Sequence, residues 1–279
     1  MTAAEKQENF DKYYGLEEIA KHLSRLSHGR LELGDIRAPS KKLYVMIIGN
    51  HSAGKSSFIN WYIEEKLQQT KVSIETIEMN LVMHGAFQTE LSGYNVKNEL
   101  PFMAELYDKK TKKERFPGLL NNLTIKTSTS RARNFEQIVF IDTPGLADGG
   151  LRYRFDVEQV YEWFAKHCDL ICVFLDPIGQ ALCQKTNQLV AKLVEKNICD
   201  VKFFMTKGDM FASEEDQVKC MCQITQTLAS CIQPAHGFEM PLIYLPNEAG
   251  QFLRSNKPLP SNQIYQLTDL IQKKLTIKA

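Results

Sequence analysis

Short apolar runs alternate with longer amphipathic stretches along most of this chain. The runs have the length and the branched or aromatic side chains of buried strands, and they are Lys42–Gly49, Asn80–Ala86, Leu123–Thr127, Gln137–Asp142, Leu170–Asp176, Val201–Thr206 and Pro241–Leu245. Apolar residues at helical spacing predict helices at Gly54–Gln69, Asp156–His167, Cys183–Lys196, Ser213–Ile232 and Gln263–Leu275. This alternation is typical of βαβ units, so we predict an α/β fold with a mainly parallel central sheet flanked by helices.

The residues before the first strand predict one more helix, because Leu16, Ile19, Leu23 and Leu26 recur at helical spacing. The chain shows no internal repeat and no proline-rich linker. We therefore expect one domain over residues 41–250, a helical N-terminal extension over residues 1–40 that packs on its core, and a helical C-terminal segment over residues 251–279.

Composition narrows the class of protein only slightly. The 279 residues are 43% hydrophobic and 24% charged, as in ordinary globular proteins, and the formal net charge of +1 favours no nucleic-acid partner. The N-terminus lacks the apolar core of a signal peptide, and no apolar run approaches the ~18 residues that span a bilayer. The seven cysteines are odd in number and lack zinc spacing, which indicates reduced thiols and a cytoplasmic location.

A phosphate-binding pattern follows the first predicted strand. It reads G-x-x-x-x-G-K-S, and with the next serine its residues are Gly49, Asn50, His51, Ser52, Ala53, Gly54, Lys55, Ser56 and Ser57. A strand that enters such a loop and a helix that leaves it direct main-chain N–H groups and the helix dipole at one anion. Lys55 would then reach the β- and γ-phosphates and Ser56 would ligate Mg²⁺, so we expect a nucleotide site with Mg²⁺ as cofactor.

Two further motifs follow in the order that a GTPase requires. IVFIDTPG places Asp142 at a strand end, where it can hold a Mg²⁺-bound water, followed by Gly145, whose N–H can sense a γ-phosphate. VKFFMTKGD ends a later strand with Thr206, Lys207 and Asp209. The Asp209 carboxylate can accept hydrogen bonds from N1–H and the exocyclic amine of guanine, while the stem of Lys207 covers the ring. We therefore predict GTP and GDP as ligands, with ATP as the alternative.

These motifs resemble those of a known family. GNHSAGKSSFIN is similar to the phosphate loop of dynamin-superfamily GTPases, and TKGD is similar to their T/N-K-x-D base motif. NLVMHG, IDTPG and EWFA resemble segments of the EH-domain-containing ATPases and sarcalumenin, and we expect Trp163 and Phe164 of EWFA to be packing residues. The resemblance runs from about Leu43 to Asp209. It implies a P-loop NTPase of the dynamin G-domain type that hydrolyses the β–γ phosphoanhydride, weakly alone and faster in a nucleotide-dependent homodimer. Asn247, at the end of the closing run PLIYLPN, completes the nucleotide-binding candidates.

The family pattern also indicates catalytic candidates. Counted back from VMHG, Thr76 falls on the switch-I threonine that ligates Mg²⁺ and bonds the catalytic water. The alternatives are Ser73 in this role or a disordered loop. His51 occupies the position of the dynamin glutamine that orients this water, and Ser52 would assist it. Ras-type switches use a glutamine where this chain has Leu146, which cannot orient water. A neutral imidazole offers one donor and one acceptor, so catalysis by His51 and a plain loop histidine bonded to a carbonyl both stay open.

The stretch YDKKTKKERF carries five basic residues within Lys109–Arg115. It either contacts anionic headgroups, which would give peripheral membrane association, or forms a solvated loop whose acidic neighbours dilute the charge. Too few residues follow the last motif to form the helical stalk of dynamins, so we do not expect membrane remodelling by this chain alone. Two alternatives to a GTPase stay open: a nucleotide-gated assembly module with negligible hydrolysis, and an ATP-preferring protein like the EH-domain relatives.

Overall fold

A computed structural model describes residues 42–68, 78–108, 111, 113–148, 153–177, 183–196, 198–211, 213–232, 239–246 and 261–278. Its strands are β1 (Leu43–Gly49), β2 (Met79–His84), β3 (Thr89–Ser92), β4 (Tyr107–Asp108), β5 (Lys113–Glu114), β6 (Leu123–Ser128), β7 (Ile138–Asp142), β8 (Leu170–Leu175) and β9 (Asp200–Met205). Its α-helices are α2 (Lys55–Ile63), α3 (Val157–Ala165), α4 (Gln184–Glu195), α5 (Glu214–Cys231) and α7 (Ile264–Lys278). Short 3₁₀ helices cover Gly93–Asn98, Pro101–Leu106, Leu120–Asn122, Ala132–Gln137 and Gly208–Met210. The predicted N-terminal helix (residues 1–40) lies outside the described residues.

The central sheet has seven strands in the order β3-β6-β2-β7-β1-β8-β9. β1 pairs in parallel with both β7 and β8, and β8 pairs in parallel with β9. β2 is parallel to β6 but antiparallel to β7, and β3 is antiparallel to β6. The predicted α/β fold with a mainly parallel sheet is therefore confirmed. Because the chain leaves β7 on one side of β1 and enters β8 on the other, the carboxyl ends of these strands meet at a switch point, where α/β proteins bind ligands.

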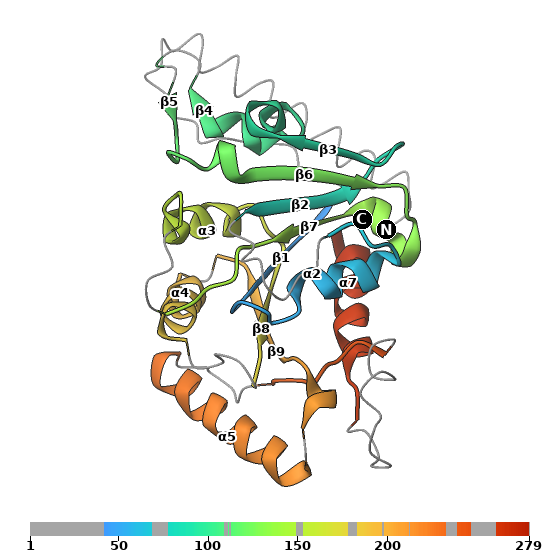
Figure 1. Cartoon of the computed structure of the whole chain (residues 1–279), viewed down its shortest axis with the longest axis vertical. Coiled ribbons are helices and arrows are strands. Elements are labelled where there is room, and N and C mark those ends of the chain that lie inside the picture. Colours follow the sequence, from blue (N-terminus) through green and yellow to red (C-terminus); the bar gives the residue numbers. More distant parts are fainter. Residues whose placement is uncertain are drawn as a thin grey trace.

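Helices cover both faces of the sheet (Figure 1). α3 and α4 lie against one face, and α2 and α7 lie against the other. All seven residues of β1 are buried, and they alternate between the two layers: Met46 belongs to the core on the α3 side, whereas Ile47 belongs to the core on the α2 side. This double burial explains why the central strands read as continuous apolar runs rather than as alternating ones.

An insertion between β3 and β6 packs on the α3 side of the sheet (Figure 1). The ring of Phe102 lies 5.6 Å from the ring of Tyr44 and 5.6 Å from that of Trp163, and it stacks on His167 at 4.5 Å. Trp163 is 3% exposed and Phe164 is fully buried, so the packing role predicted for this pair is confirmed. β3 was not predicted, since its exposed TELS sequence carries no apolar run.

Part of the basic stretch belongs to this insertion. The Nη1 atom of Arg115 lies 2.8 Å from the Oε2 atom of Glu105, and its guanidinium lies 5.9 Å from the Trp163 ring. Lys109, Lys110 and Lys112 fall outside the described residues. Arg115 is therefore held against the core by an ion pair and a cation–π contact.

The helix predicted over Gly54–Gln69 is wrong in its second half, because α2 ends at Ile63. The next residue, Glu64, takes a left-handed conformation with φ 56°, which ends an α-helix. Its amide donates to the main-chain oxygen of Trp61 at 3.3 Å. Residues 64–68 therefore leave the helix axis, although their composition favours helix.

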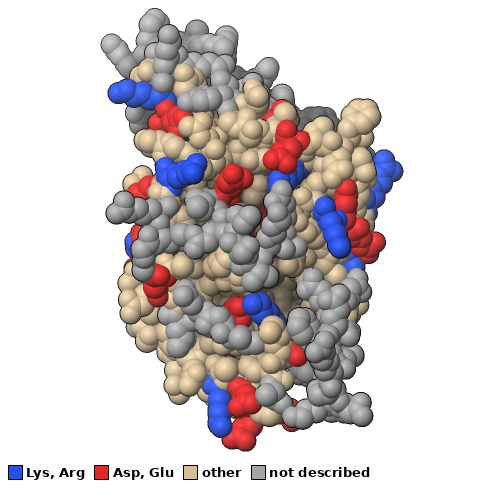
Figure 2. Space-filling view, in the orientation of Figure 1, with Lys and Arg blue, Asp and Glu red and all other residues tan. Residues whose placement is uncertain are grey.

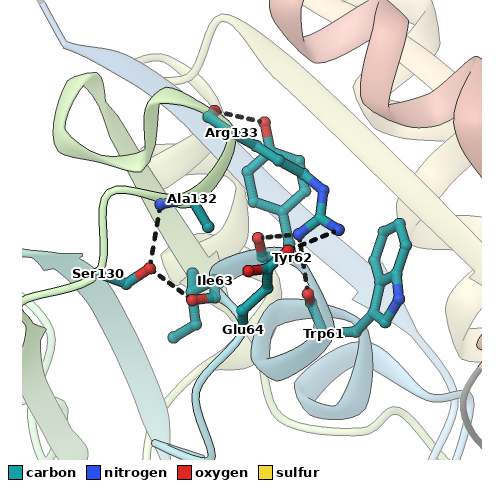
Figure 3. A network of polar contacts seen from close by, with 7 residues as sticks. All are labelled: Trp61, Tyr62, Ile63, Glu64, Ser130, Ala132 and Arg133. Carbon is teal, nitrogen blue, oxygen red and sulfur yellow. Dashed lines mark hydrogen bonds and ion pairs between the residues drawn. The ribbon is translucent and has the colours of Figure 1, made fainter.

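Side chains from the segment after β6 hold this helix end (Figure 3). Arg133 donates from Nη1 to the main-chain oxygens of Trp61 at 3.0 Å and Tyr62 at 2.5 Å. Ser130 donates from its hydroxyl to the main-chain oxygen of Ile63 at 2.5 Å. These donors satisfy carbonyls that a continuing helix would have paired, so a distant segment fixes where α2 ends.

The strand predicted over Pro241–Leu245 is also corrected, because the structure has a single parallel bridge there, between Met205 and Leu242. Ile243 pairs there with β9 through its main chain: its amide donates to Met205 at 2.8 Å, and its oxygen accepts from the Gly208 amide at 3.3 Å. Side chains near the start of α7 bond the main-chain amides that point away from β9. Gln263 accepts from the Leu242 amide at 2.9 Å, and Asn262 accepts from the Tyr244 amide at 3.2 Å.

None of the helices in the described part of the chain combines the length and the apolar character needed to cross a bilayer. On the face shown in Figure 2, basic and acidic side chains are interspersed over the described residues rather than gathered by sign. This distribution agrees with the formal net charge of +1.

Candidate nucleotide site

The predicted phosphate loop lies between the carboxyl end of β1 and the first turn of α2. A Cβ atom on Gly49 would lie 2.4 Å from the main-chain oxygen of Phe174, so only glycine fits there. Gly54 has φ +85°, a conformation that favours glycine, and Ser52 takes φ 59°. The loop therefore has the strand–turn–helix setting in which main-chain N–H groups bind an anion.

Lys55 turns back over this loop. Its ammonium group donates to the main-chain oxygens of Asn50 at 2.9 Å and Gly49 at 3.2 Å, and the residue is 7% exposed. Burial lowers the pKa of Lys55 to about 8, although the negative charge of Asp142 acts in the opposite direction. The lysine lies where its charge can meet a phosphate bound by the loop.

Ser56 and Asp142 meet at the end of β7. The Ser56 hydroxyl donates to the Oδ2 atom of Asp142 at 2.6 Å, and Asp142 is 1% exposed. Burial raises the pKa of Asp142, while the charge of Lys55 and the bond from Ser56 act to lower it. The Oδ1 atom has no hydrogen-bond partner among the described residues. A buried carboxylate oxygen without a donor, beside a hydroxyl, is a donor set that fits Mg²⁺. The third predicted ligand, Thr76, falls outside the described residues.

The DTPG turn lies directly against the phosphate loop. The amide of Leu146 donates to Gly49 and the amide of His51 donates to Leu146, each at 3.2 Å. A Cβ atom on Gly145 would lie 2.6 Å from the Cα atom of His51. Two motifs that are far apart in sequence are therefore brought into van der Waals contact.

The two catalytic candidates of the loop lie at this contact. His51 is partly exposed and Ser52 is exposed. No described residue hydrogen-bonds to the imidazole of His51, so the alternative of a histidine bonded to a carbonyl finds no partner in this part of the chain. Both side chains are accessible to a ligand held by the loop.

The base motif follows β9. Thr206 donates from its amide to Leu175 at 2.9 Å, and the ammonium group of Lys207 lies 2.6 Å from the Oδ2 atom of Asp176 at the end of β8. Burial raises the pKa of Asp209, while its own amide and the charge of Lys207 act to lower it. Neighbouring strands lie about 4.8 Å apart, so the loops after β1 and β9, with β8 between them, are about 10 Å apart. A purine nucleotide can span this separation. Asn247 lies outside the described residues.

The sequence motifs did not reveal several further side chains at the site. Asn50 is fully buried and accepts from the Thr186 hydroxyl at 2.5 Å. Asp148 accepts from the amides of Gln184 at 2.8 Å and Lys185 at 3.1 Å, and thus caps α4. Gln68 donates from Nε2 to Asp142 at 3.2 Å. Each contact joins segments that are distant in sequence, so no local pattern indicates it.

Comparison with known proteins agrees with this geometry. The family model described as the dynamin family matches residues 45–206, which is more than half of the chain. EH domain-containing protein 2 of Rattus norvegicus is 25% identical over 181 residues, covering 62% of this chain and 32% of the relative. EH domain-containing protein 1 of Bos taurus is 22% identical over the same length and share of each chain. The chain thus spans about a third of the length of these relatives.

A solved structure shares the fold. One chain of an oligomerised bacterial dynamin pair superposes with a TM-score of 0.57 at 15% identity, over 98% of this chain and 45% of that chain. That pair is described as providing a mechanism for the long-range sensing and tethering of membranes. The matched family model, the sheet order and the phosphate loop together show that this chain belongs to the dynamin family.

Proposed function

We propose that this chain is a Mg²⁺-dependent dynamin-like G domain that binds GTP and hydrolyses its β–γ phosphoanhydride bond. The observation that carries the proposal is the cluster of buried Lys55, buried Asp142 and partly buried Ser56 at the phosphate loop. The buried Oδ1 atom of Asp142 has no donor among the described residues, and such an atom is costly to keep in a fold unless a ligand compensates it.

The residues of this cluster have separate roles. The ammonium group of Lys55 binds the β- and γ-phosphates, and the loop amides bind the remaining phosphate oxygens. Ser56, Asp142 and Thr76 would hold Mg²⁺, which would offset the charge of the phosphate oxygens. Gly145 contacts the loop at His51, so a γ-phosphate held there reaches the DTPG turn as well.

His51 and Ser52 orient the attacking water in this proposal. The imidazole of His51 is partly exposed at the loop and has a nitrogen available to accept a hydrogen bond from water. Leu146, which follows the DTPG turn, is 3% exposed and apolar, so it cannot take this role. A positioned general base contributes about 10²- to 10⁴-fold to a rate.

Asp209 accepts from the N1–H and the exocyclic amine of guanine, and Thr206 and Asn247 are the further nucleotide-binding candidates of this part of the chain. The ion pair between Lys207 and Asp176 holds the ammonium group, which leaves the aliphatic stem of Lys207 to cover the ring. The G domain comprises residues 41–250, and the segment 251–279 contributes α7, which packs on the sheet. Self-association and peripheral membrane contact follow by analogy with the oligomerised bacterial dynamin pair. The nucleotide dependence of a homodimer follows from the resemblance to dynamins alone.

Phosphate release with GTP and with ATP tests this function, with Lys55→Ala as the inactive control. We expect the wild-type protein to turn GTP over faster than ATP. His51→Ala should lower kcat about 100-fold or more with little change in GTP affinity. Lys55→Ala should abolish nucleotide binding. Wild-type release equal to that of Lys55→Ala would refute hydrolysis, and faster release with ATP would refute the guanine assignment.

A second function, a nucleotide-gated assembly module with negligible hydrolysis, is favoured by one observation. His51 stands where the dynamin pattern has a glutamine, and Leu146 stands where Ras-type switches have one. Tight, Mg²⁺-dependent GTP binding without phosphate release, together with GTP-dependent self-association in analytical ultracentrifugation, would select this function over the first.

A further inference from the structure

Gln68 reaches into the Asp142 site from a segment that carries no recognised motif. The residue is 5% exposed, and its Nε2 atom donates to the Oδ2 atom of Asp142 at 3.2 Å. The same Oδ2 atom accepts from the Ser56 hydroxyl at 2.6 Å. A neutral amide is thus the second donor to a buried carboxylate.

The main chain of Gln68 is clamped by one side chain of α2. The Oδ1 atom of Asn60 accepts from the amides of Leu67 at 3.0 Å and Gln68 at 2.8 Å, and its Nδ2 atom donates to the main-chain oxygen of Gln68 at 2.8 Å. The asparagine therefore satisfies both main-chain groups of Gln68. With its main chain held in this way, Gln68 has its side chain positioned to reach Asp142.

Asn60 can bond the main chain of Leu67 and Gln68 because α2 ends at Ile63. Figure 3 shows Arg133 and Ser130 at the carbonyls of the last turn. Had the helix continued, residues 64–68 would extend away along its axis, and Gln68 could not return to the level of Asn60. The amide of Glu65 instead donates to the main-chain oxygen of Asn60 at 3.1 Å, which begins the return.

We propose that Gln68 is a positioning residue that orients the Asp142 carboxylate for Mg²⁺, an inference that rests on the proposed Mg²⁺-dependent nucleotide site. Two donors on Oδ2 stop the carboxylate from rotating, and Oδ1 is left without a donor among the described residues. Hydrogen bonds from outside the ligand set hold ligands in this way, and their loss typically costs about 10- to 100-fold in metal affinity.

The test measures the Mg²⁺ concentration that half-maximally slows the release of fluorescent mant-GDP, with mant-ADP in parallel. Gln68→Met keeps the side-chain length but removes the donor, so we expect a 10- to 100-fold higher Mg²⁺ midpoint and an unchanged release rate in EDTA. Asn60→Ala, which removes the clamp, should shift the midpoint in the same direction, and Asn60→Asp, which keeps the acceptor oxygen, should shift it less. Gln226→Ala, on the exposed face of α5, is the control and should match wild type.

The outcomes are distinguishable. A Gln68→Met midpoint equal to that of wild type overturns the positioning role while leaving the proposed function intact. An equal acceleration of release in Mg²⁺ and in EDTA also overturns it, since that result indicates a general loss of structure. If wild-type release does not respond to Mg²⁺ at all, the proposed function itself fails, and this inference fails with it. Should Gln68→Met not fold, Asn60→Asp gives the same test with a smaller expected shift.

Discussion

The ammonium group of Lys55 lies 2.9 Å from the main-chain oxygen of Asn50, within the loop that it is expected to serve. The lysine is almost fully buried, and burial lowers its pKa to about 8 from an ordinary value of 10.5. Its charge is therefore only partly present under mildly alkaline conditions, which has a direct consequence for ligand binding.

Nucleotide binding should take up a proton near and above pH 8. Phosphates favour the charged form of Lys55, whose pKa of about 8 places part of the protein in the neutral form at that pH. We expect affinity to fall as the pH rises above 8, by up to about tenfold per unit. Titration calorimetry at pH 8.5 in buffers of different ionisation enthalpy measures the proton uptake. Lys55→Arg, whose guanidinium does not titrate in this range, should show no such proton uptake. A wild-type affinity that is constant from pH 7 to 10 would contradict the prediction.

Asp209→Asn should lower the affinity for GTP by about 10- to 100-fold, because hydrogen bonds to a charged acceptor contribute about 1.5–3 kcal/mol. It should also raise the affinity for xanthosine triphosphate, whose C2 carbonyl can accept from the new amide. Competition binding with both nucleotides checks this. Asp269→Asn, an exposed carboxylate on α7, is the control. Unchanged GTP affinity in Asp209→Asn would remove this residue from the base site.

Gly145→Ala should separate the DTPG turn from the phosphate loop. The added Cβ atom would lie 2.6 Å from the Cα atom and 2.8 Å from the amide nitrogen of His51, and neither is the end of a flexible side chain. Overpacking of this kind costs about 1–3 kcal/mol. We expect a lower melting temperature and a larger loss of affinity for a non-hydrolysable GTP analogue than for GDP. Equal losses for the two nucleotides would show that this contact does not depend on the γ-phosphate.

Arg133→Ala should lower the free energy of unfolding by about 2–3 kcal/mol, because it removes two hydrogen bonds from a charged donor and a cation–π contact. The guanidinium lies 4.3 Å from the Trp61 ring and 3.2 Å from the Glu64 carboxylate. Urea unfolding measures the change. Arg131→Ala is a matched control, since its side chain is 80% exposed and its ion pair is 3.8 Å long, and it should change stability by less than about 0.5 kcal/mol.

The sequence predicted those parts of the fold that depend on burial alone. β1, β7 and β8 were found as apolar runs because they are buried throughout, with packed layers on both faces. The strand predicted over Pro241–Leu245 is a single bridge at Leu242 in the structure. The end of α2 was predicted wrongly, because the side chain of Arg133 decides it from elsewhere in the chain. Propensity within a segment contains no information about such partners.

The same distinction applies to the site. Its contiguous motifs brought Lys55, Ser56 and Asp142 together as expected. The contact of Gln68 with Asp142 spans 74 residues and that of Thr186 with Asn50 spans 136 residues. Contacts between residues that are far apart in the chain could not be found from one sequence. The functions predicted for the site residues, including Thr76 and Asn247, stay predictions.

The first turn of α4 is tied twice to the nucleotide site: Thr186 bonds Asn50 of the phosphate loop, and the amides of Gln184 and Lys185 bond Asp148 beyond the DTPG turn. Further along, α4 is clipped to α3 by two parallel ion pairs, Lys192 with Glu158 and Lys196 with Glu162. A force applied to this pair of helices from outside would therefore reach the loop after β1 and the segment after the DTPG turn through these two contacts. In mechanical terms, α4 connects the surface formed with α3 to the loop that is predicted to bind the nucleotide.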